Sequence, residues 1–170
     1  METRKKVDIV VINWNSGELT MEAIAPYLNY NSSYISCNVI IVDNASTDGS
    51  INQLKNQANI LIKNKENAGF GKACNQAYKE CDGDYILLLN PDTVSNVQVL
   101  EGLVKFMENN PRYGITGPTQ LVKPGSPLKS CARFPTFFTA LYEILGLSKV
   151  FPRIFTPAPQ MTDWDHLKSK

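Results

Sequence analysis

The sequence has few of the residues that most often build metal centres and hydrolytic active sites. Its 170 residues include one histidine, His166, close to the end of the chain, and four cysteines, Cys37, Cys74, Cys81 and Cys131, that form no C-x-x-C pair. A single late histidine excludes a His-rich metal site and a Ser-His-Asp triad in the core. The cysteine spacing indicates neither a zinc site nor a disulfide framework, so a reducing cytosol is the expected compartment.

Long apolar runs and an excess of one charge are also lacking. No stretch reaches the roughly 18 apolar residues of a membrane span, and the charged start of the chain leads directly into a predicted strand rather than into a signal peptide. The formal net charge is +1, which excludes the global basic field typical of nucleic-acid-binding proteins. We therefore expect a cytoplasmic chain with no nucleic-acid partner.

Three short apolar runs each end abruptly in Asn or Asp. They are Val7–Ile12 before Asn13, Val39–Val42 before Asp43, and Ile86–Leu89 before Asn90, Pro91 and Asp92. Such runs are typical of strands buried on both faces of a parallel sheet. Because ligands bind at the carboxyl ends of the strands in open α/β sheets, the sequence predicts one polar rim, with Asp43 and Asp92 in a shared cleft.

Strands and helices alternate along most of the chain, which favours βαβ units around a mostly parallel α/β sheet. Strands are expected over 7–13, 38–43, 59–63, 84–89 and 113–116, and helices over 16–30, 49–57, 69–81, 97–109 and 136–146. Ser16, Asp48 and Asn67 are candidate N-caps, and Pro26 weakens the last turns of the first helix.

The composition changes in the last third of the chain. An irregular connection is predicted from the turn formers Pro118, Pro124, Gly125 and Pro127. The Pro-rich polar tail from Thr156 is expected to be partly disordered. The chain should therefore have two parts, a βαβ ligand-binding core over 1–117 and a connection with a tail over 118–170.

The polar residues at the predicted rim suit a nucleotide and a divalent cation. A carboxylate at a strand end, such as Asp43, can accept hydrogen bonds from a pyrimidine N–H or a ribose hydroxyl, or it can simply stabilise the turn. Asn90 and Asp92, held by the rigid Pro91, offer oxygen ligands that suit Mg²⁺ or Mn²⁺ shared with a substrate's phosphates. The alternative for this pair is an Asn-Pro turn in which Asp92 caps the next helix.

The stretch from Asn67 to Lys72 contains two glycines at a predicted helix start. Such glycines let backbone N–H groups approach an anion, which the helix dipole favours, and Lys72 adds a positive charge. The alternative is a capped helix in which Gly69 and Gly71 serve close packing. A dinucleotide fingerprint is excluded because Cys74 takes the place of its third glycine.

An aromatic stretch in the second part has helical spacing: Phe134, Phe137, Phe138, Leu141, Tyr142 and Leu145. Two roles stay open, packing on the domain itself and contact with a membrane surface or a lipid acceptor, helped by Arg133, Lys149 and Arg153. Apolar surface that this helix only partly covers would favour self-association, as a homodimer or a swapped dimer.

Four motifs occur in a specific order: VVINWNS at 10–16, IIVDNASTDGS at 40–50, ENAGFGKACNQA at 66–77 and LLLNPDT at 87–93. Together they resemble the family 2 glycosyltransferases with the GT-A fold, in particular the rhamnosyltransferase-like members. The resemblance covers residues 7–117 and continues more loosely through SCARFPTFF at 130–138. It implies a mostly parallel, Rossmann-like sheet with flanking helices, incomplete here in its C-terminal half.

The resemblance also implies an activity and assigns residues to it. The expected reaction is the inverting transfer of a sugar from a nucleotide-diphospho-sugar to a saccharide or lipid-linked acceptor in cell-surface polysaccharide synthesis. The donor would be a UDP- or dTDP-sugar, with dTDP-rhamnose as one candidate. The residues expected at the donor nucleotide are Asn13, Trp14, Asn15, Asp43, Asn67, Gly69 and Lys72, and those expected at a Mg²⁺ or Mn²⁺ ion are Asp92 and Asn90.

Two departures from the family's pattern shape the expectation. The family's Asp-x-Asp motif reads Asn90-Pro91-Asp92 here, and no convincing match to its later Glu-Asp catalytic base exists in 117–170. We therefore expect the base beyond Lys170, and a chain that binds the donor without transferring the sugar. A non-catalytic nucleotide-sugar-binding module is the alternative. Residues 118–170 would begin the acceptor-side half, and the inner face of the membrane is one expected location.

Overall fold

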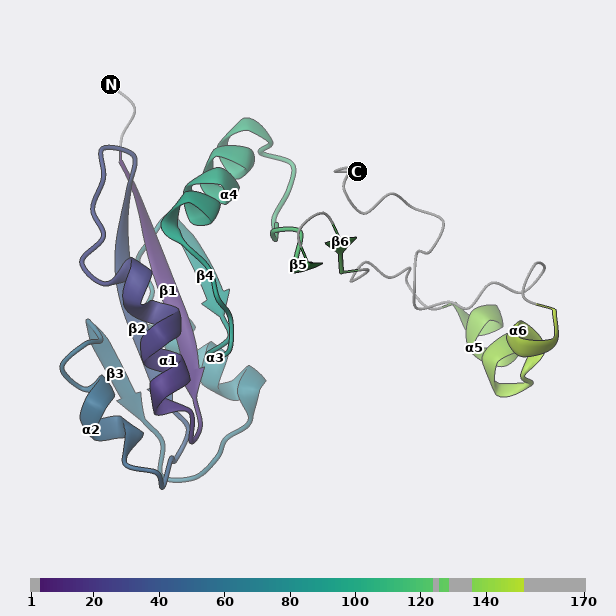
Figure 1. The fold of residues 1–170 in the computed structure, drawn as a ribbon, viewed down its shortest axis with the longest axis horizontal. Helices are drawn as coiled ribbons and strands as arrows, with labels where there is room; N and C mark the ends of the chain where they lie inside the picture. Colours follow the sequence, from purple (N-terminus) through teal and green to yellow (C-terminus); the bar gives the residue numbers. More distant parts are fainter. Residues whose placement is uncertain (1–3, 124–125, 129–135, 152–170) are drawn as a thin grey trace. The chain divides into compact units, whose positions relative to one another are not determined.

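The computed structural model describes residues 4–123, 126–128 and 136–151 (Figure 1). The chain divides into two compact units, Met1–Thr116 and Gly117–Lys170. The first unit is an α/β layer structure that carries the predicted rim. The second unit contains a short hairpin and two short helices.

A four-stranded sheet forms the centre of the first unit. Its strands are β1 (Lys5–Asn13), β2 (Ile35–Asp43), β3 (Ile60–Lys63) and β4 (Tyr85–Leu89), in the order β3-β2-β1-β4. All three pairings are parallel, and the longest register runs from Lys5 opposite Ile35 to Asn13 opposite Asp43. The predicted parallel α/β sheet is therefore confirmed, and its two longest strands end side by side.

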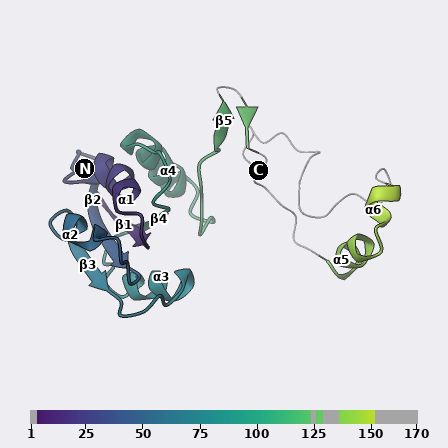
Figure 2. The same cartoon turned by 60° about the horizontal axis from the view of Figure 1, so that its bottom comes forward.

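Helices cover both faces of this sheet. They are α1 (Gly17–Ile24), the 3₁₀ turn η1 (Ala25–Tyr27), α2 (Ser50–Leu54), α3 (Phe70–Tyr78) and α4 (Val97–Asn109). Figure 2 shows α1 and α4 on one side of the strands and α3 on the other. Side chains of β1 alternate between the two layers, since Ile9 packs in the cluster with α1 and α4 whereas Val10 packs with Ala73 and Ala77 of α3.

The first helix is shorter than predicted. It ends at Ile24, and Pro26 lies at the start of η1 instead of inside a helix that reaches Tyr30. A proline inside the helix would remove a backbone hydrogen bond and clash with the preceding turn. The chain therefore changes to 3₁₀ geometry where the prediction had placed only a weakened helix.

The strand predicted over 113–116 is wrong. The Tyr113 N–H donates to the Asn110 carbonyl, and the Tyr113 ring lies 5.5 Å, between centroids, from the ring of Phe106 in α4. These contacts fold the segment against the end of α4, and Ile115 is 91 % exposed. Among the described residues β4 consequently has a neighbour only on its β1 side, and its Ile86 and Leu88 are exposed. The predicted self-association stays a prediction.

The second unit contains a hairpin where an irregular connection was predicted. Strand β5 (Leu121–Lys123) pairs antiparallel with β6 (Ser126–Pro127). The predicted helix near 136–146 is confirmed as α5 (Phe137–Ile144), which Thr136 caps, and α6 (Leu147–Val150) follows. None of the helices in the described ranges is long and apolar enough to cross a membrane. The predicted tail from Thr156 lies outside the described residues.

A buried carboxylate locks the amino end of the sheet. Asp8 in β1 is fully enclosed, and its side chain accepts hydrogen bonds from the Asp82 N–H at 2.9 Å, the Gly83 N–H at 2.7 Å and Asn38 Nδ2 at 2.7 Å. These bonds fix the turn that leads into β4. A Cβ on Gly83 would lie 2.9 Å from the Lys6 carbonyl oxygen and 3.0 Å from an Asp8 carboxylate oxygen.

We predict that Gly83→Ala destabilises the first unit by about 1–3 kcal/mol, because backbone and buried carboxylate must move apart. The matched control is Gly102→Ala in the middle of α4, where an added Cβ meets nothing within 4 Å. That control should stabilise by roughly 0.5–1 kcal/mol, since alanine has the higher helix propensity. Urea unfolding measures both, and a Gly83→Ala variant as stable as the parent would contradict the lock.

Candidate functional site at the carboxyl rim of the sheet

The carboxyl ends of three strands meet at one rim, as the sequence predicts. Asn13 ends β1 directly opposite Asp43 at the end of β2, and Asn90 follows β4 on the other side of β1. Because β1 lies between β2 and β4, the outer two ends are two strand spacings apart, about 10 Å. The polar residues singled out from the sequence lie at the carboxyl ends of the strands and in the loops that follow them, except Lys72, which lies in α3.

The side chain of Asn13 is the centre of a polar cluster at this rim. Asn13 is 0 % exposed. Five side chains lie at 2.8–3.0 Å from its amide: Asp43, Ser46 and Ser50 around Nδ2, which donates, and Ser16 and Thr20 donating to Oδ1. Since an amide nitrogen carries two hydrogens, the three acceptors share them. The enclosed amide thus joins β1, β2, α1 and α2, and it holds the rim together.

Close approach of α1 to α2 depends on a glycine. A Cβ on Gly17 would lie 2.4 Å from the Cβ of Ser50, so only glycine fits at the start of α1. Ser16 precedes this helix as predicted, but its hydroxyl makes no cap hydrogen bond and donates to Asn13 Oδ1 instead. The capping role predicted for Ser16 is therefore wrong, because its hydroxyl binds the Asn13 side chain and not the backbone of the helix.

Asp43 is built into the turn after β2. It is 2 % exposed, one carboxylate oxygen accepts from Asn13 Nδ2 at 2.8 Å, and the other accepts from the Ser46 N–H at 3.2 Å. Asp43 thus stabilises the turn after β2, which was the structural alternative to nucleotide binding. Asp48 accepts from the Ser50 N–H at 3.0 Å, beside the N-cap position of α2 that Gly49 occupies, and hydrogen bonds from Ser50 lower the pKa of the Asp48 carboxyl.

A second buried amide, Asn44, ties the α3 loop to the rim. Its N–H donates to the Asn13 carbonyl at 2.8 Å, and its Nδ2 donates to Asn67 Oδ1 at 2.7 Å. Its Oδ1 accepts from Asn64 Nδ2 at 3.0 Å and from the Ala68 N–H at 2.9 Å. The sequence did not lead us to single out Asn44, although its position directly after Asp43, at the end of a strand, could have indicated its role.

Gly69, directly before α3, provides backbone freedom. Gly69 has φ +79°, a conformation that favours glycine, and its N–H donates to Asn67 Oδ1 at 2.9 Å. A Cβ on Gly69 or Gly71 would meet nothing within 4 Å, so the close-packing alternative is wrong. The N-cap predicted at Asn67 is wrong, because Gly69 occupies the N-cap position of α3 and no side chain makes a cap hydrogen bond there. Lys72 is exposed in the first turn of this helix, which begins at Phe70.

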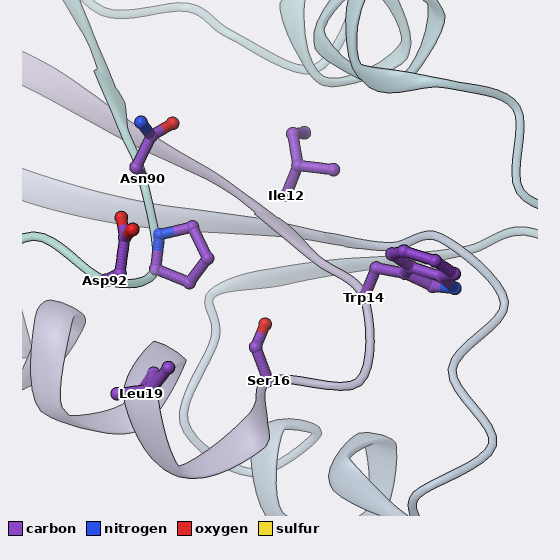
Figure 3. Close-up of a pocket in the computed structure, with 7 residues that line it drawn as sticks. Ile12, Trp14, Ser16, Leu19, Asn90 and Asp92 are labelled. Atoms are coloured by element: carbon purple, nitrogen blue, oxygen red, sulfur yellow. The ribbon is translucent and has the colours of Figure 1, made fainter.

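An open cleft of about 370 Å³ lies between the ends of β1 and β4 (Figure 3). Its lining consists of Ile12, Trp14, Ser16, Leu19, Asn90, Pro91 and Asp92. Figure 3 shows Asn90 and Asp92 at one end, Trp14 at the other, and Ser16 between them. The Trp14 ring is 57 % exposed. Asp43 is not part of this lining, so the predicted sharing of one cleft by Asp43 and Asp92 is not observed.

Asn15 fixes the loop next to Trp14. It adopts φ +51°, its N–H donates to Ser46 Oγ at 3.0 Å, and its Oδ1 accepts from the Thr47 N–H at 2.7 Å. Both bonds join the loop after β1 to the loop after β2. The exposed Trp14 is therefore held in place by hydrogen bonds at the surface of the rim.

Asp92 is not used as a helix cap. Asn96 caps α4 instead, and its Oδ1 accepts from the Val99 N–H at 3.0 Å. Asp92 and Asn90 supply one carboxylate and one amide oxygen at the cleft. Within the described ranges no group of three or more His, Cys, Asp or Glu side chains could hold a metal ion. This donor set fits a divalent cation only if a ligand's phosphates and water complete the coordination.

We predict that Asn13→Ala destabilises the first unit by about 2–4 kcal/mol, because it leaves Asp43, Ser50 and Thr20 without a buried partner. The control is Asn75→Ala at an exposed position of α3, which should change stability by less than about 0.5 kcal/mol. Urea unfolding followed by circular dichroism measures both variants. Equal stability of the two would show that Asn13 does not hold the rim.

Comparisons with known proteins agree with this architecture. The profile of the family "Glycosyl transferase family 2" matches residues 8–162. The putative glycosyltransferase EpsE of Bacillus subtilis strain 168 is 30 % identical over 128 residues, which make up 72 % of this chain and 45 % of EpsE.

Solved structures show the same fold. The mannosyltransferase PcManGT from Pyrobaculum calidifontis, in complex with GDP-Man and Mn²⁺, superposes with TM-score 0.56 at 23 % identity over 72 % of this chain and 36 % of its own. S. aureus TarS 1-349 in complex with UDP-GlcNAc gives 0.52 at 21 % identity over 69 % and 38 %. The parallel sheet with its flanking helices is that of the GT-A fold. The chain spans less than half the length of each of these three proteins, and the family profile, which covers most of the chain, shows that it belongs to glycosyl transferase family 2.

Proposed function

We propose that the chain is the donor-binding part of an inverting glycosyltransferase. It would take a UDP- or dTDP-sugar, with dTDP-rhamnose as the specific candidate, for transfer to a saccharide or lipid-linked acceptor in cell-surface polysaccharide synthesis. The supporting observation is the rim, where a member of this family places an exposed indole, a carboxylate and an amide in one cleft. The proposed location is the cytoplasm, at the inner face of the membrane.

The nucleoside is proposed to lie over the ends of β1 and β2. Trp14 offers an exposed ring face for stacking, and Asn15 holds that loop in place. Each carboxylate oxygen of Asp43 has a lone pair beyond its bonds from Asn13 and Ser46. Because Asp43 is almost enclosed, it would meet the nucleoside only at its edge. The enclosed Asn13 would position these residues and make no direct contact.

The diphosphate is proposed to face the start of α3. A lysine in the first turn of a helix opposes the helix dipole, so Lys72 is electrostatically unfavourable there unless an anion is bound nearby. Asn67 and Gly69 shape the backbone that approaches this anion. The same reasoning favours a polyanionic ligand over a neutral sugar alone.

Asp92 and Asn90 are proposed to hold Mg²⁺ or Mn²⁺ together with the diphosphate. Their oxygen atoms suit both ions, and the incomplete donor set explains why a phosphate would be needed. A cation bound there would offset the charge of the leaving diphosphate. The Pyrobaculum mannosyltransferase, which shares the fold and was solved with GDP-Man and Mn²⁺, supports the use of a divalent ion.

The general base is proposed to lie outside this chain. The acidic residues between 118 and 170 are Glu143, Asp163 and Asp165, and none forms a Glu-Asp pair. In the described part of the second unit Glu143 lies on the exposed surface of α5. The 170 residues would thus bind the donor without deprotonating an acceptor hydroxyl. A non-catalytic nucleotide-sugar-binding module remains the second candidate.

We predict that UDP or dTDP binds with an affinity that Mn²⁺ increases, as measured by isothermal titration calorimetry. Asp92→Asn should lower the affinity in Mn²⁺ by at least about tenfold, because it removes the carboxylate ligand. Asp43→Asn should weaken binding roughly ten- to hundredfold by replacing a charged acceptor. The control is Glu22→Gln on the exposed face of α1, which should bind like the parent.

Urea unfolding of each variant separates lost binding from lost folding. Absence of binding by either nucleotide in the presence of Mn²⁺ would contradict the donor site. Affinity that survives both Asp43→Asn and Asp92→Asn unchanged would contradict the residue assignment.

We predict that the 170-residue chain binds a nucleotide sugar but does not turn it over. Release of UDP from a UDP-sugar, or of dTDP from dTDP-rhamnose, in the presence of saccharide acceptors should stay at the buffer rate. Rapid release would show that the base lies within these residues, and it would also reject the non-catalytic module. If release is absent, the downstream reading frame decides between the two candidates, because only a transferase needs an acid pair there.

A further inference from the structure

The segment 136–151, here named the α5–α6 hairpin, exposes most of its apolar side chains, while Leu141, Tyr142 and Leu147 are partly buried. No residue of α5 is buried, and Phe137 is 77 % and Ile144 81 % exposed. Phe138, Leu145, Val150 and Phe151 are also more than half exposed. Single exposed apolar residues are ordinary, but a contiguous aromatic group of this kind marks an interaction site.

The apolar side chains of α5 share one face. At 100° per residue, Phe137, Phe138, Leu141, Tyr142, Ile144 and Leu145 fall within an arc of roughly 160°, with Thr139 and Glu143 on the opposite side. The ring centroids of Phe137 and Phe138 are 5.8 Å apart, and those of Phe138 and Tyr142 are 6.4 Å apart. The face is therefore a continuous aromatic patch.

Local hydrogen bonds preform this patch. Thr136 and Thr139 make a reciprocal cap at the start of α5, and Gly146, at φ +68°, turns the chain into α6. The Phe151 N–H donates to the Leu147 carbonyl at 2.8 Å and closes the second helix. Docking would thus not require the hairpin to fold first.

Basic residues are concentrated in the stretch of sequence that contains and flanks the hairpin. Residues 118–162 contain five basic side chains, Lys123, Lys129, Arg133, Lys149 and Arg153, against the single acidic Glu143. Residues 1–117 contain ten basic and thirteen acidic side chains. The near-neutral whole chain therefore combines an acidic first part with a strongly basic segment.

We propose that the α5–α6 hairpin docks on an anionic lipid surface, with its aromatic face at the headgroup–acyl boundary and the exposed Lys149 facing lipid phosphates. An eight-residue helix is about 12 Å long and cannot cross a hydrocarbon core of about 30 Å, so it would lie along the surface. Surplus positive charge beside an aromatic face complements anionic lipid better than it complements a second copy of the same basic segment. This inference does not depend on the donor site.

The test is co-sedimentation of the 170-residue chain with phosphatidylcholine vesicles and with mixed phosphatidylcholine–phosphatidylglycerol vesicles. Binding to the anionic vesicles should be at least about tenfold tighter and should weaken at high salt. The double variant Phe138→Asp, Leu145→Asp should reduce binding by at least about tenfold. The matched control, Tyr78→Asp on α3, replaces a side chain that is 67 % exposed in the first unit and should bind like the parent.

Lys149→Glu separates the charge contribution from the apolar one. It should lower binding to the anionic vesicles by about fivefold while binding to neutral vesicles stays the same. Urea unfolding of the first unit should be unchanged in all hairpin variants, because the substituted side chains are exposed. Equal binding by the double variant, equal binding to both vesicle types, or no vesicle binding would each overturn the proposal. A dimer in light scattering that the double variant abolishes, without vesicle binding, would assign the patch to a second copy instead.

Discussion

The enclosed amide of Asn13 is the interaction on which the rim depends. Loops at the end of a parallel sheet have lost the strand ladder, so their polar groups need other partners. Asn13 supplies both a donor and an acceptor at the point where β1, β2, α1 and α2 meet. Gly17 makes this arrangement possible, since any side chain there would collide with Ser50. The ends of β1 and β2 are thereby held in one register. This register positions the loops that follow the two strands and the side chains that these loops carry.

The rim has a closed half and an open half. Asn13, Asp43 and Asn44 are buried and bonded to one another's loops, whereas Trp14, Asn90 and Asp92 line a cleft that solvent enters. This division is what a binding site on a rigid scaffold requires, because exposed side chains hold their geometry only when a buried shell fixes their backbone. Asn15 makes the connection, as its N–H donates to Ser46, which also accepts from the buried Asn13. In the proposed function the ligand touches mainly the open half.

The sequence predicts the sheet better than it predicts the roles of the residues at its rim. Apolar runs that end in Asn or Asp identify three of the four strands of the first unit, β1, β2 and β4. Two-sided burial explains the runs of β1 and β2, whereas β4 exposes Ile86 and Leu88. The strand over 113–116 fails because a local turn to Asn110 and the ring contact with Phe106 hold that segment at the end of α4, and an apolar pattern alone does not show such contacts. The cluster around Asn13 depends on the Asn13–Asp43 register and on the Gly17–Ser50 contact. Neither the register nor the contact can be inferred from the spacing of residues along the sequence. Asn13, which was expected to touch the ligand, is enclosed in the structure.

The distribution of charge connects the two proposals without any contact between the units. A first unit with three more acidic than basic side chains repels a nucleotide diphosphate at long range. Binding there would need local compensation, which a cation beside Asp92 and the lysine at the start of α3 can supply. The surplus of positive charge lies instead in the segment that contains the aromatic hairpin. An anionic lipid surface attracts such a segment, because many lipid phosphates interact with several dispersed basic side chains at once. The segregation of charge along the sequence therefore agrees with a separate anionic partner for each of the two parts.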